Sequence, residues 1–510
     1  MTSRLVHFWR LLKWGRTLAR HGALLGLERS PTTPMAFRRI ARLARLGAFL
    51  PAQPDYAGAF EKIGPAAVKL GQTLATRPDL VGEEAAHDLL RLQDTLAPLP
   101  FAKVRAAIEQ SLDAPIETLF ASIDPDPVGS ASIAQVHKAV TTDGHSVAVK
   151  VLRPGIDEKF TSDIDTYEWI AAHAAARGGE LARLRPREVI ATFRQWTMRE
   201  LDLRREAAAA SELAAMMSAE DGYFVPAIDW KRTSRRVMTL DWIDGIKLTD
   251  RQALAEAGLD LSHISRTLVR TFLTQAITHG FFHADLHQGN LFVLRDGRIA
   301  AIDFGIMGRI NRQARIWLAE ILYGLITGNY RRVAEIHFEA QYVPAHHNVD
   351  EFATALRAVG EPIRGAAVKD ISVGNMLDGL FAITREFDMQ TQPHLLLLQK
   401  TMVMVEGVAS SLDPEINMWD AAGPFVEQWL RDELGPEARL ADSILRGVRT
   451  LASLPDLLRR VDAHYPPPGA APPLPPLPDV EVRPSGWWRY ALAALAGGGL
   501  VAALHALTSF

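Results

Sequence analysis

Hydrophobic and polar residues recur with two different periods along the chain, and the change of period marks its organisation. Over residues 54–111 the apolar positions follow helical spacing. At the Asp-Pro-Asp-Pro sequence of residues 124–127 the pattern changes, and strands are predicted at residues 133–140 and 146–152. Thr142-Asp143-Gly144 between them is typical of a hairpin turn. The sequence therefore predicts a helical segment followed by antiparallel sheet.

Beyond this hairpin, long helical stretches alternate with short strands. Helices are predicted at residues 157–177, 187–218, 262–279 and, with interruptions, 312–461. Strands are predicted at residues 237–243, 291–294 and 299–303. Asp296-Gly297 joins the last two strands as a second hairpin. The order of elements predicts an α+β fold whose second half is mainly helical.

The two ends of the chain differ from this body. Residues 463–485 are rich in proline and predict a stiff, extended linker. Residues 490–507 carry no formal charge, and Trp487, Trp488 and Arg489 precede them. An apolar stretch of this length with an aromatic and basic flank predicts a transmembrane helix within residues 486–510, and a docking helix or hairpin is the alternative. Arginines only on its near side would keep the body cytoplasmic.

The N-terminal residues 1–53 begin with a basic amphipathic pattern, in which arginines and a lysine alternate with leucine, phenylalanine and tryptophan. No uninterrupted apolar segment of a secretory signal follows. Such a helix suits an anionic membrane surface, or it packs on the body of the protein, and the pattern leaves both open.

The amino-acid composition restricts the possible catalytic chemistry but says little about the fold. The 510 residues include no cysteine, which excludes disulfides, thiolate metal sites and a cysteine nucleophile. The net charge of −3 indicates no general attraction to nucleic acid. Catalysis would therefore have to use carboxylates, amides, lysine, histidine, hydroxyls or a bound cofactor.

The strongest chemical pattern lies between a predicted helix and the second hairpin. Asp285 is followed five residues later by Asn290, and the hairpin ends at Asp303-Phe304-Gly305. This spacing is that of the protein-kinase catalytic loop and metal-binding motif. Asp285 would orient or deprotonate a hydroxyl acceptor, while Asn290 and Asp303 offer the oxygen ligands that Mg²⁺ prefers. A rival interpretation places His283 and His287 on one helix face as zinc ligands.

Two further segments fit a nucleotide site in the expected order. Lys150 ends Val-Ala-Val-Lys on a strand, as does the phosphate-binding lysine of kinases. The segment before it would be the nucleotide-binding loop, although only one glycine is present: Val128, Gly129, Ser130, Ala131, Ser132, Ile133, Ala134, Gln135 and Val136. An acidic helix partner for Lys150 is expected, and either Glu200 or Glu206 meets the requirement.

Together these motifs resemble the UbiB family, also called the aarF or ADCK family of atypical kinases. Lys69-Leu70-Gly71-Gln72 matches its Lys-x-Gly-Gln motif, and Glu200-Leu201-Asp202 matches its Glu-x-Asp motif. The loop from His283 to Asn290 is similar to the family's catalytic loop, with Leu286 and Gln288 where two prolines are usual. The nucleotide-binding loop has Gly129 where relatives often carry alanine. The resemblance covers about residues 54–420.

The resemblance implies a bilobal protein-kinase-like fold with ATP, or ADP, and Mg²⁺ bound between the lobes. It implies that Lys69 and Gln72 of an N-terminal helical extension lie over this site, with Glu200 and Asp202 nearby. The expected segments are an amphipathic region at 1–53, the extension at 54–123, an N-lobe at 124–245, a helical C-lobe at 246–462, the linker at 463–485 and the membrane segment at 486–510.

The resemblance also implies a role in ubiquinone biosynthesis at the bacterial inner membrane. The expected partners are membrane lipids or polyprenyl quinone intermediates and other enzymes of that biosynthesis, and no nucleic acid. Two alternatives stay open: a lipid-handling scaffold that uses nucleotide as a switch, and a small-molecule phosphotransferase, because such enzymes share the spacing of the catalytic loop.

Overall fold

The computed structural model describes most of the chain up to Leu434. The described residues are 2–24, 54–75, 83–89, 91–92, 97–176, 186–220, 222–361, 383–384, 386–389 and 393–434. The proline-rich linker and the predicted membrane segment fall outside these ranges. Within them, no helix has both the length and the hydropathy that a membrane crossing requires.

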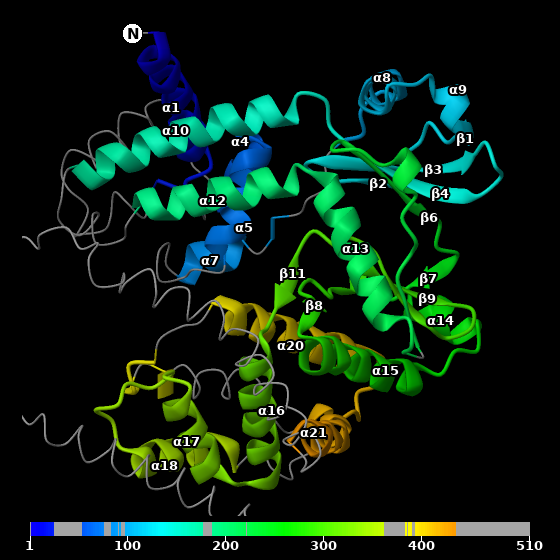
Figure 1. Ribbon diagram of the computed structural model, residues 1–510. Coiled ribbons are helices and arrows are strands. Elements are labelled where there is room, and N and C mark those ends of the chain that lie inside the picture. The colour runs from blue at the N-terminus through cyan, green and yellow to red at the C-terminus, as the bar shows by residue number, and fades with distance from the viewer. Residues whose placement is uncertain are drawn as a thin grey trace, which may run out of the picture. The chain divides into compact units, whose positions relative to one another are not determined.

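An antiparallel five-stranded sheet forms the centre of the N-lobe (Figure 1). Its strand order is β1-β3-β4-β6, and β2 pairs with the start of β3. The strands are β1 (Phe120–Ile123), β2 (Gly129–Ser130), β3 (Ala134–Thr141), β4 (Ser146–Leu152) and β6 (Val237–Asp241). The predicted hairpin is confirmed, because Ala134 to Val140 pair in continuous register with Leu152 to Ser146.

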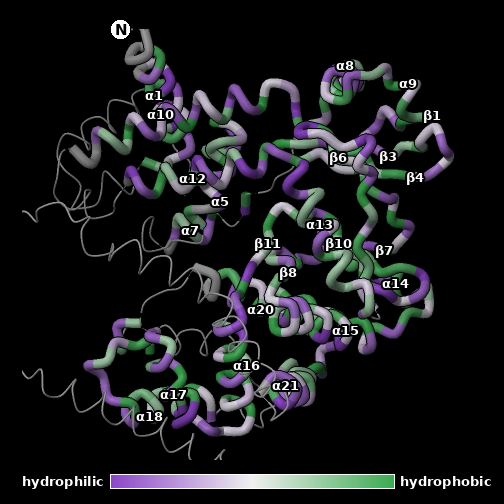
Figure 2. Tube along the Cα trace, in the orientation of Figure 1, coloured by the Kyte–Doolittle hydropathy of each residue, from purple (hydrophilic) through white to green (hydrophobic). Residues whose placement is uncertain are grey.

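The sheet begins earlier than the boundary we expected at residue 124, because β1 lies before it and pairs with β3. Only Phe120 of this strand is fully buried, so the strand shows little hydrophobic alternation. One face of the sheet is covered by α8 (Phe101–Leu112) and the short α9 (Ile116–Leu119). Figure 2 shows hydrophobic and hydrophilic residues together on α8, whose Val104 and Ile108 are buried against the strands.

The helices α10 (Ile156–Ala176), α12 (Pro186–Glu200) and α13 (Leu203–Met217) follow β4. The prediction of one helix over residues 187–218 was wrong, because the chain leaves helical geometry at Leu201 and Asp202. Asp202 is extended and accepts a hydrogen bond from the Arg204 backbone N–H, so it caps the N-terminus of α13. The break gives α13 a direction independent of α12.

The N-terminal helices pack beside this group (Figure 1). They are α1 (Thr2–Arg20), α4 (Tyr56–Ile63), α5 (Pro65–Ala75) and α7 (Glu83–Leu89). α1 contacts α10: Arg10 donates to the Ser162 hydroxyl at 2.6 Å, and Trp14 is buried with its ring centroid 5.2 Å from that of Tyr167. One face of the basic helix therefore packs on the body of the protein.

The C-lobe consists of helices around small sheets. β5 (Tyr223–Phe224), β10 (Ile299–Ala301), β9 (Leu291–Leu294) and β7 (Gly245–Lys247) form one sheet in that order, and β8 (Phe281–His283) pairs with β11 (Met307–Arg309). The helices are α14 (Arg251–Glu256), α15 (Leu261–Leu273), α16 (Arg312–Thr327), α17 (Tyr330–Glu339), α18 (Val349–Gly360), α20 (Pro393–Leu412) and α21 (Met418–Leu434). Two 3₁₀ turns lie at Trp230–Arg232 and Gln288–Asn290.

The helix predicted over residues 262–279 changes character before it ends. α15 continues as a π-helical turn over Thr274–His279 and stops at Gly280, whose φ is +67°. Within this turn the buried Gln275 side chain accepts a hydrogen bond from the backbone N–H of His283 at 3.0 Å. The π turn thus helps to fix the segment that precedes Asp285.

Candidate active site

An ion pair between Lys150 and Glu206 links the sheet to the helix beside it. Lys150 lies on β4, and its Nζ is 2.6 Å from Oε1 of Glu206 on α13. The two side chains are only 14% and 8% exposed, so water screens the pair weakly. The sequence left Glu200 and Glu206 open as partners. The structure selects Glu206, which lies in the first turn of α13 just after the helix break.

The Lys150–Glu206 pair also contacts the Asp-Phe-Gly segment at residues 303–305. Oε1 of Glu206 also accepts a hydrogen bond from the Phe304 backbone N–H at 3.3 Å, and Oδ2 of Asp303 lies 3.6 Å from the Lys150 ammonium. The side chain of Asp303 is still 49% exposed, so one side of the carboxylate faces solvent. Three segments that are distant in sequence therefore meet at one lysine.

This arrangement shifts the pKa of each group. Burial opposes the charged form of Lys150, but the carboxylates of Asp303 and Glu206 outweigh burial and raise its pKa. The partial burial of Asp303 also opposes its charge, yet Lys150 and the Gly305 N–H lower the pKa of this carboxyl. Burial raises the pKa of Glu206 in spite of Lys150. Lys150 and Asp303 are thus charged at neutral pH.

Asp303 has a strained backbone conformation that its neighbours maintain. Its φ is +66°, in the left-handed region that residues other than glycine seldom adopt. Its Oδ1 accepts a hydrogen bond from the Gly305 N–H at 3.2 Å, which compensates part of the cost. The second strand of the hairpin ends at Ala301, so Asp303 lies in the loop after β10.

The loop that carries Asp285 is held by its own backbone. The pairing of β8 with β11 fixes its start, and the Ala284 N–H donates to the Ile306 carbonyl at 3.0 Å. The Asn290 amide Nδ2 donates to the Asp285 carbonyl at 3.0 Å and to its carboxylate at 3.3 Å. The Asn290 amide oxygen is then the group that can ligate a cation. The backbone carbonyl of Asn290 accepts a hydrogen bond from the Ile302 N–H at 2.9 Å, which ties this loop to the segment before Asp303.

The alternative zinc site at His283 and His287 does not have the helical geometry that it requires. His283 ends strand β8, is fully buried, and accepts the Asp285 N–H through Nδ1 at 3.1 Å. Burial lowers the pKa of His283 and favours the neutral ring. His287 caps the following 3₁₀ turn through the Gly289 N–H. Both histidines therefore brace the loop.

The predicted nucleotide-binding loop forms the edge of the sheet. Val128 pairs with Val136 through a backbone hydrogen bond, and Ala131 with Ala134, so the segment turns tightly between β2 and β3. Arg153, a buried residue that we did not expect here, donates to the Ala131 carbonyl at 2.9 Å and to the Ser130 hydroxyl at 2.8 Å. These two hydrogen bonds fix the turn of the loop at Ser130 and Ala131.

Several residues of this loop are buried and contribute to the packing of the N-lobe. Gln135 is buried, and its side-chain oxygen accepts the Leu99 N–H at 2.7 Å. Ser132 and Ala134 are buried, whereas Val128 is exposed. Gly129 is not conformationally obligatory, because a β-carbon there would meet no atom within 4 Å and its φ is not positive.

The motif of the N-terminal extension lies close to the Asp-Phe-Gly segment. Lys69 on α5 pairs with Glu200 at the end of α12 at 3.0 Å, and its charge contributes to the lowered pKa of Asp303. Gln72 lies three residues further along α5 and is half-buried. Asp202 points elsewhere: its carboxylate binds the Arg204 guanidinium at 2.9 and 2.7 Å. Glu200 and Asp202 therefore have different roles, an ion pair to the extension and a helix cap.

Gly71 of the same motif is required by packing. A β-carbon at Gly71 would overlap the side chains of Leu92 and Phe60 and lie 3.3 Å from Leu89. The glycine therefore allows α4 and α7 to approach α5 closely, and this places Lys69.

Helix α20 contributes contacts to the loop around Asp285 that the sequence did not indicate. The Lys400 ammonium lies 3.7 Å from Oδ1 of Asp285, and the Thr401 hydroxyl donates to the Ala284 carbonyl at 3.3 Å. Gln288 donates through Nε2 to the Ser411 hydroxyl at 2.9 Å. More than 110 residues separate these partners in sequence, so no local pattern could have revealed them.

Comparison with known proteins defines the class. A family model for the ABC1 atypical kinase-like domain matches residues 91–337, and one for the UbiB helical domain matches residues 356–417. The chain has a kinase-like α+β fold. It also has the Lys150–Glu206 ion pair, and Asp285, Asn290 and Asp303 occur at the spacing of the kinase motifs. It belongs to the UbiB family of atypical kinases, as the residues in its motifs predict.

Two relatives support this assignment. The chain is 42% identical over 382 residues to a protein of Marinobacter nauticus named "Probable protein kinase UbiB", an alignment that covers 74% of this chain and 70% of the relative. Among solved structures, the complex of Rv3197 with erythromycin from Mycobacterium tuberculosis matches with a TM-score of 0.51 and 26% identity. That match covers 70% of this chain and 91% of the mycobacterial one.

Proposed function

We propose that this protein binds ATP with Mg²⁺ and acts as an atypical kinase or ATPase that supports ubiquinone biosynthesis at the membrane. One observation carries the proposal: Lys150, Glu206 and Asp303 form a connected charged group beside the Asp285 loop. This is the constellation that phosphoryl transfer from a nucleotide requires.

Each residue has a definite part in the proposed reaction. Lys150, kept charged by its two acidic neighbours, would contact the nucleotide phosphates. Asp303 and the amide oxygen of Asn290 are hard oxygen donors that suit Mg²⁺, which would neutralise charge on the phosphates. Asp285 would accept the proton of an attacking hydroxyl or water. The γ-phosphoryl group then passes to that oxygen, the bond to ADP breaks, and ADP leaves.

The position of the extension favours a small or lipid acceptor. Lys69 pairs with Glu200, and its charge helps to lower the pKa of Asp303, so the extension would leave less room for an extended peptide. Membrane lipids and polyprenyl quinone intermediates are the acceptors or clients that the family suggests. Partner enzymes of the same biosynthesis belong to this proposal, and nucleic acid does not.

The N-terminal helix supports attachment to the membrane surface. On the face of α1 that does not pack on the body, Val6, Trp9 and Leu12 are exposed, and the side chain of Trp9 is 65% exposed. The exposed basic residues Lys13 and Arg16 lie next to them. An apolar ridge flanked by basic residues suits anionic lipid headgroups. We propose an inner-membrane location with the kinase-like body in the cytoplasm, and the segment at residues 486–510 as a second anchor.

Nucleotide titration of an Asp303→Asn variant tests the site directly. We expect Mg²⁺-dependent ATP binding and turnover to be lost. Asp296→Asn, the same substitution at the exposed turn of the same hairpin, is the matched control and should retain both. Unchanged binding and ATPase activity in Asp303→Asn would contradict the proposed site.

The biological role is tested by quinone profiling of a strain that lacks the gene. Low ubiquinone, restored by the wild type and not by Lys150 or Asp285 variants, is the expected result. Normal quinone in the deletion strain would refute the biosynthetic role. Rescue by Asp285→Ala would favour the nucleotide-switched scaffold over phosphoryl transfer.

A further inference from the structure

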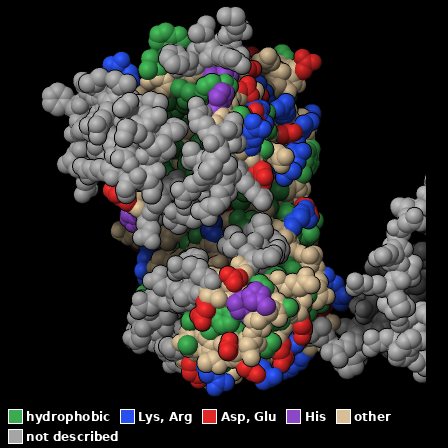
Figure 3. Space-filling model, turned by 90° about the vertical axis from the view of Figure 1, so that its left-hand side faces the viewer, with side chains coloured by type: hydrophobic (Ala, Val, Ile, Leu, Met, Phe, Trp, Pro, Cys, Tyr) green, Lys and Arg blue, Asp and Glu red, His purple; other side chains and the backbone are tan. Residues whose placement is uncertain are grey.

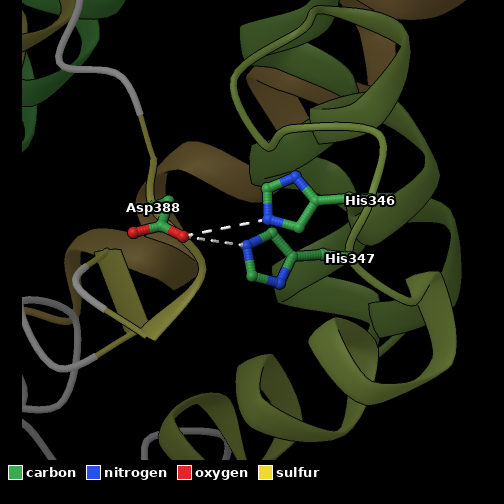
Figure 4. A group of neighbouring side chains, drawn as sticks. All are labelled: His346, His347 and Asp388. Carbon is green, nitrogen blue, oxygen red and sulfur yellow. Dashed lines mark ion pairs between the residues drawn. The ribbon is translucent and has the colours of Figure 1, made fainter.

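Two histidines and an aspartate converge on the surface of the C-lobe, away from the motifs discussed so far. His346 and His347 lie between α17 and α18, and Asp388 lies after the Ile383–Thr384 segment. Their ligand atoms all lie within 4.8 Å of one another. Figure 4 shows both rings directed at the same carboxylate, and Figure 3 shows histidine beside acidic side chains on this face of the molecule.

The separations fit a single ion better than they fit hydrogen bonds. His347 Nε2 is 3.4 Å and His346 Nε2 is 3.9 Å from Oδ2 of Asp388. Ligands about 2.1 Å from a tetrahedral zinc ion lie about 3.4 Å from each other. The distance from His347 matches this value, and that from His346 requires only a small movement of an exposed side chain.

Three further features of the local structure suit a bound ion. Nε2 of His347 is buried and has no hydrogen-bond partner, which is costly for an imidazole nitrogen unless something else binds it. The ring is only 18% exposed and packs against His346 and Phe387, so its direction is fixed. Asp388 has a φ of +49°, a strained backbone that presents its carboxylate to the two rings.

We infer that His346, His347 and Asp388 form a binding site for a divalent transition-metal ion of the zinc class. Two imidazoles and one carboxylate, with water as the fourth ligand, are a typical zinc donor set. Zinc binds such nitrogen and oxygen ligands more tightly than iron(II) or manganese(II) does. The ion would join the α17–α18 loop to the segment at Asp388, and so close the chain between residues 347 and 388. The site is independent of the proposed nucleotide chemistry.

The test uses the purified full chain, stripped of metal with a chelator and titrated with Zn²⁺ without nucleotide. We expect one zinc equivalent per chain, with affinity reduced at least tenfold in His347→Ala and Asp388→Asn. Zinc should also raise the thermal midpoint of the wild type and not of these variants. Co²⁺ provides a second probe, because its visible spectrum distinguishes four-coordinate protein sites from the hydrated ion.

His145→Ala is the matched control, because His145 also lies 3.9 Å from an aspartate, Asp143, but these two form a pair without a second histidine. We expect this variant to bind zinc like the wild type. The chain has 16 histidines, so weak binding elsewhere is separated from the site by the variants. Equal zinc affinity in the wild type, His347→Ala and Asp388→Asn would overturn the inference, as would the absence of any binding above that of free histidine. Circular dichroism of the metal-free variants verifies that they fold.

Discussion

The ammonium of Lys400 lies 3.7 Å from the carboxylate of Asp285, although 115 residues separate them in sequence. Lys400 projects from α20, the helix whose Thr401 and Ser411 also bind the catalytic loop. The helical segment after the kinase-like domain thus does more than cover the C-lobe. It provides a positive charge at the side chain proposed to accept the proton.

We expect Lys400→Met to reduce turnover of ATP by about tenfold, equivalent to about 1.4 kcal/mol, because Asp285 loses the charge that orients it. The KM for ATP should change little if Lys400 acts on Asp285 and not on the nucleotide. Steady-state kinetics measure both constants. Lys247→Met, at an exposed lysine of β7, is the control.

The outcome separates this role from the proposed function itself. A wild type that neither binds nor hydrolyses ATP would remove the basis for both. A wild type that is active together with an equally active Lys400→Met variant would contradict the role of Lys400 alone.

Breaking the buried ion pair should cost more than removing both charges. Lys150→Met leaves Glu206 without its partner, and we expect a loss of about 3 kcal/mol in the free energy of unfolding. Adding Glu206→Gln to Lys150→Met should recover part of that loss, while ATP binding stays absent. Urea unfolding of both variants measures the difference, and a double variant less stable than Lys150→Met would contradict this account.

Two glycines of the family motifs should respond oppositely to the same substitution. Gly71→Ala forces a methyl group against Phe60 and Leu92, and we expect a loss of about 1–3 kcal/mol. Gly129→Ala places the methyl group in open space, and we expect a gain of about 0.4–1 kcal/mol from the less flexible unfolded chain. Thermal and denaturant unfolding measure both, and similar effects of the two would refute the packing argument.

Stability should fall on mild acidification because of buried histidines. Burial lowers the pKa of both His283 and His337 in the folded protein. Below about pH 6.5 the unfolded chain therefore binds more protons than the folded protein does. The stabilisation that the neutral histidines give the folded protein is lost progressively as the pH falls towards their folded pKa. We expect the free energy of unfolding to decline from pH 7 to pH 5.

His337 allows this to be tested away from the proposed active site. It lies on α17, and its Nδ1 is 2.7 Å from the Val333 carbonyl. His337→Gln should make the decline less steep, by up to about 1.4 kcal/mol per pH unit. An unchanged slope between pH 7 and pH 5 would exclude His337 as a source, and the exposed His145→Gln serves as the control.

The family, the hairpin that carries Lys150 and the spacing of Asp285, Asn290 and Asp303 could be predicted from the sequence. These features are local: alternation, turn residues and short motifs are encoded by neighbours along the chain. The hairpin after β3 was predicted to within one residue for this reason.

Which of these groups meet depends on the folded structure. Glu206 pairs with Lys150, and Glu200 with Lys69, because a two-residue break separates α12 from α13. Lys400, Arg153 and the cluster at His346 depend on segments that approach one another only after folding. Contacts of this kind follow from packing across the whole core, and helical or strand periodicity carries no information about them.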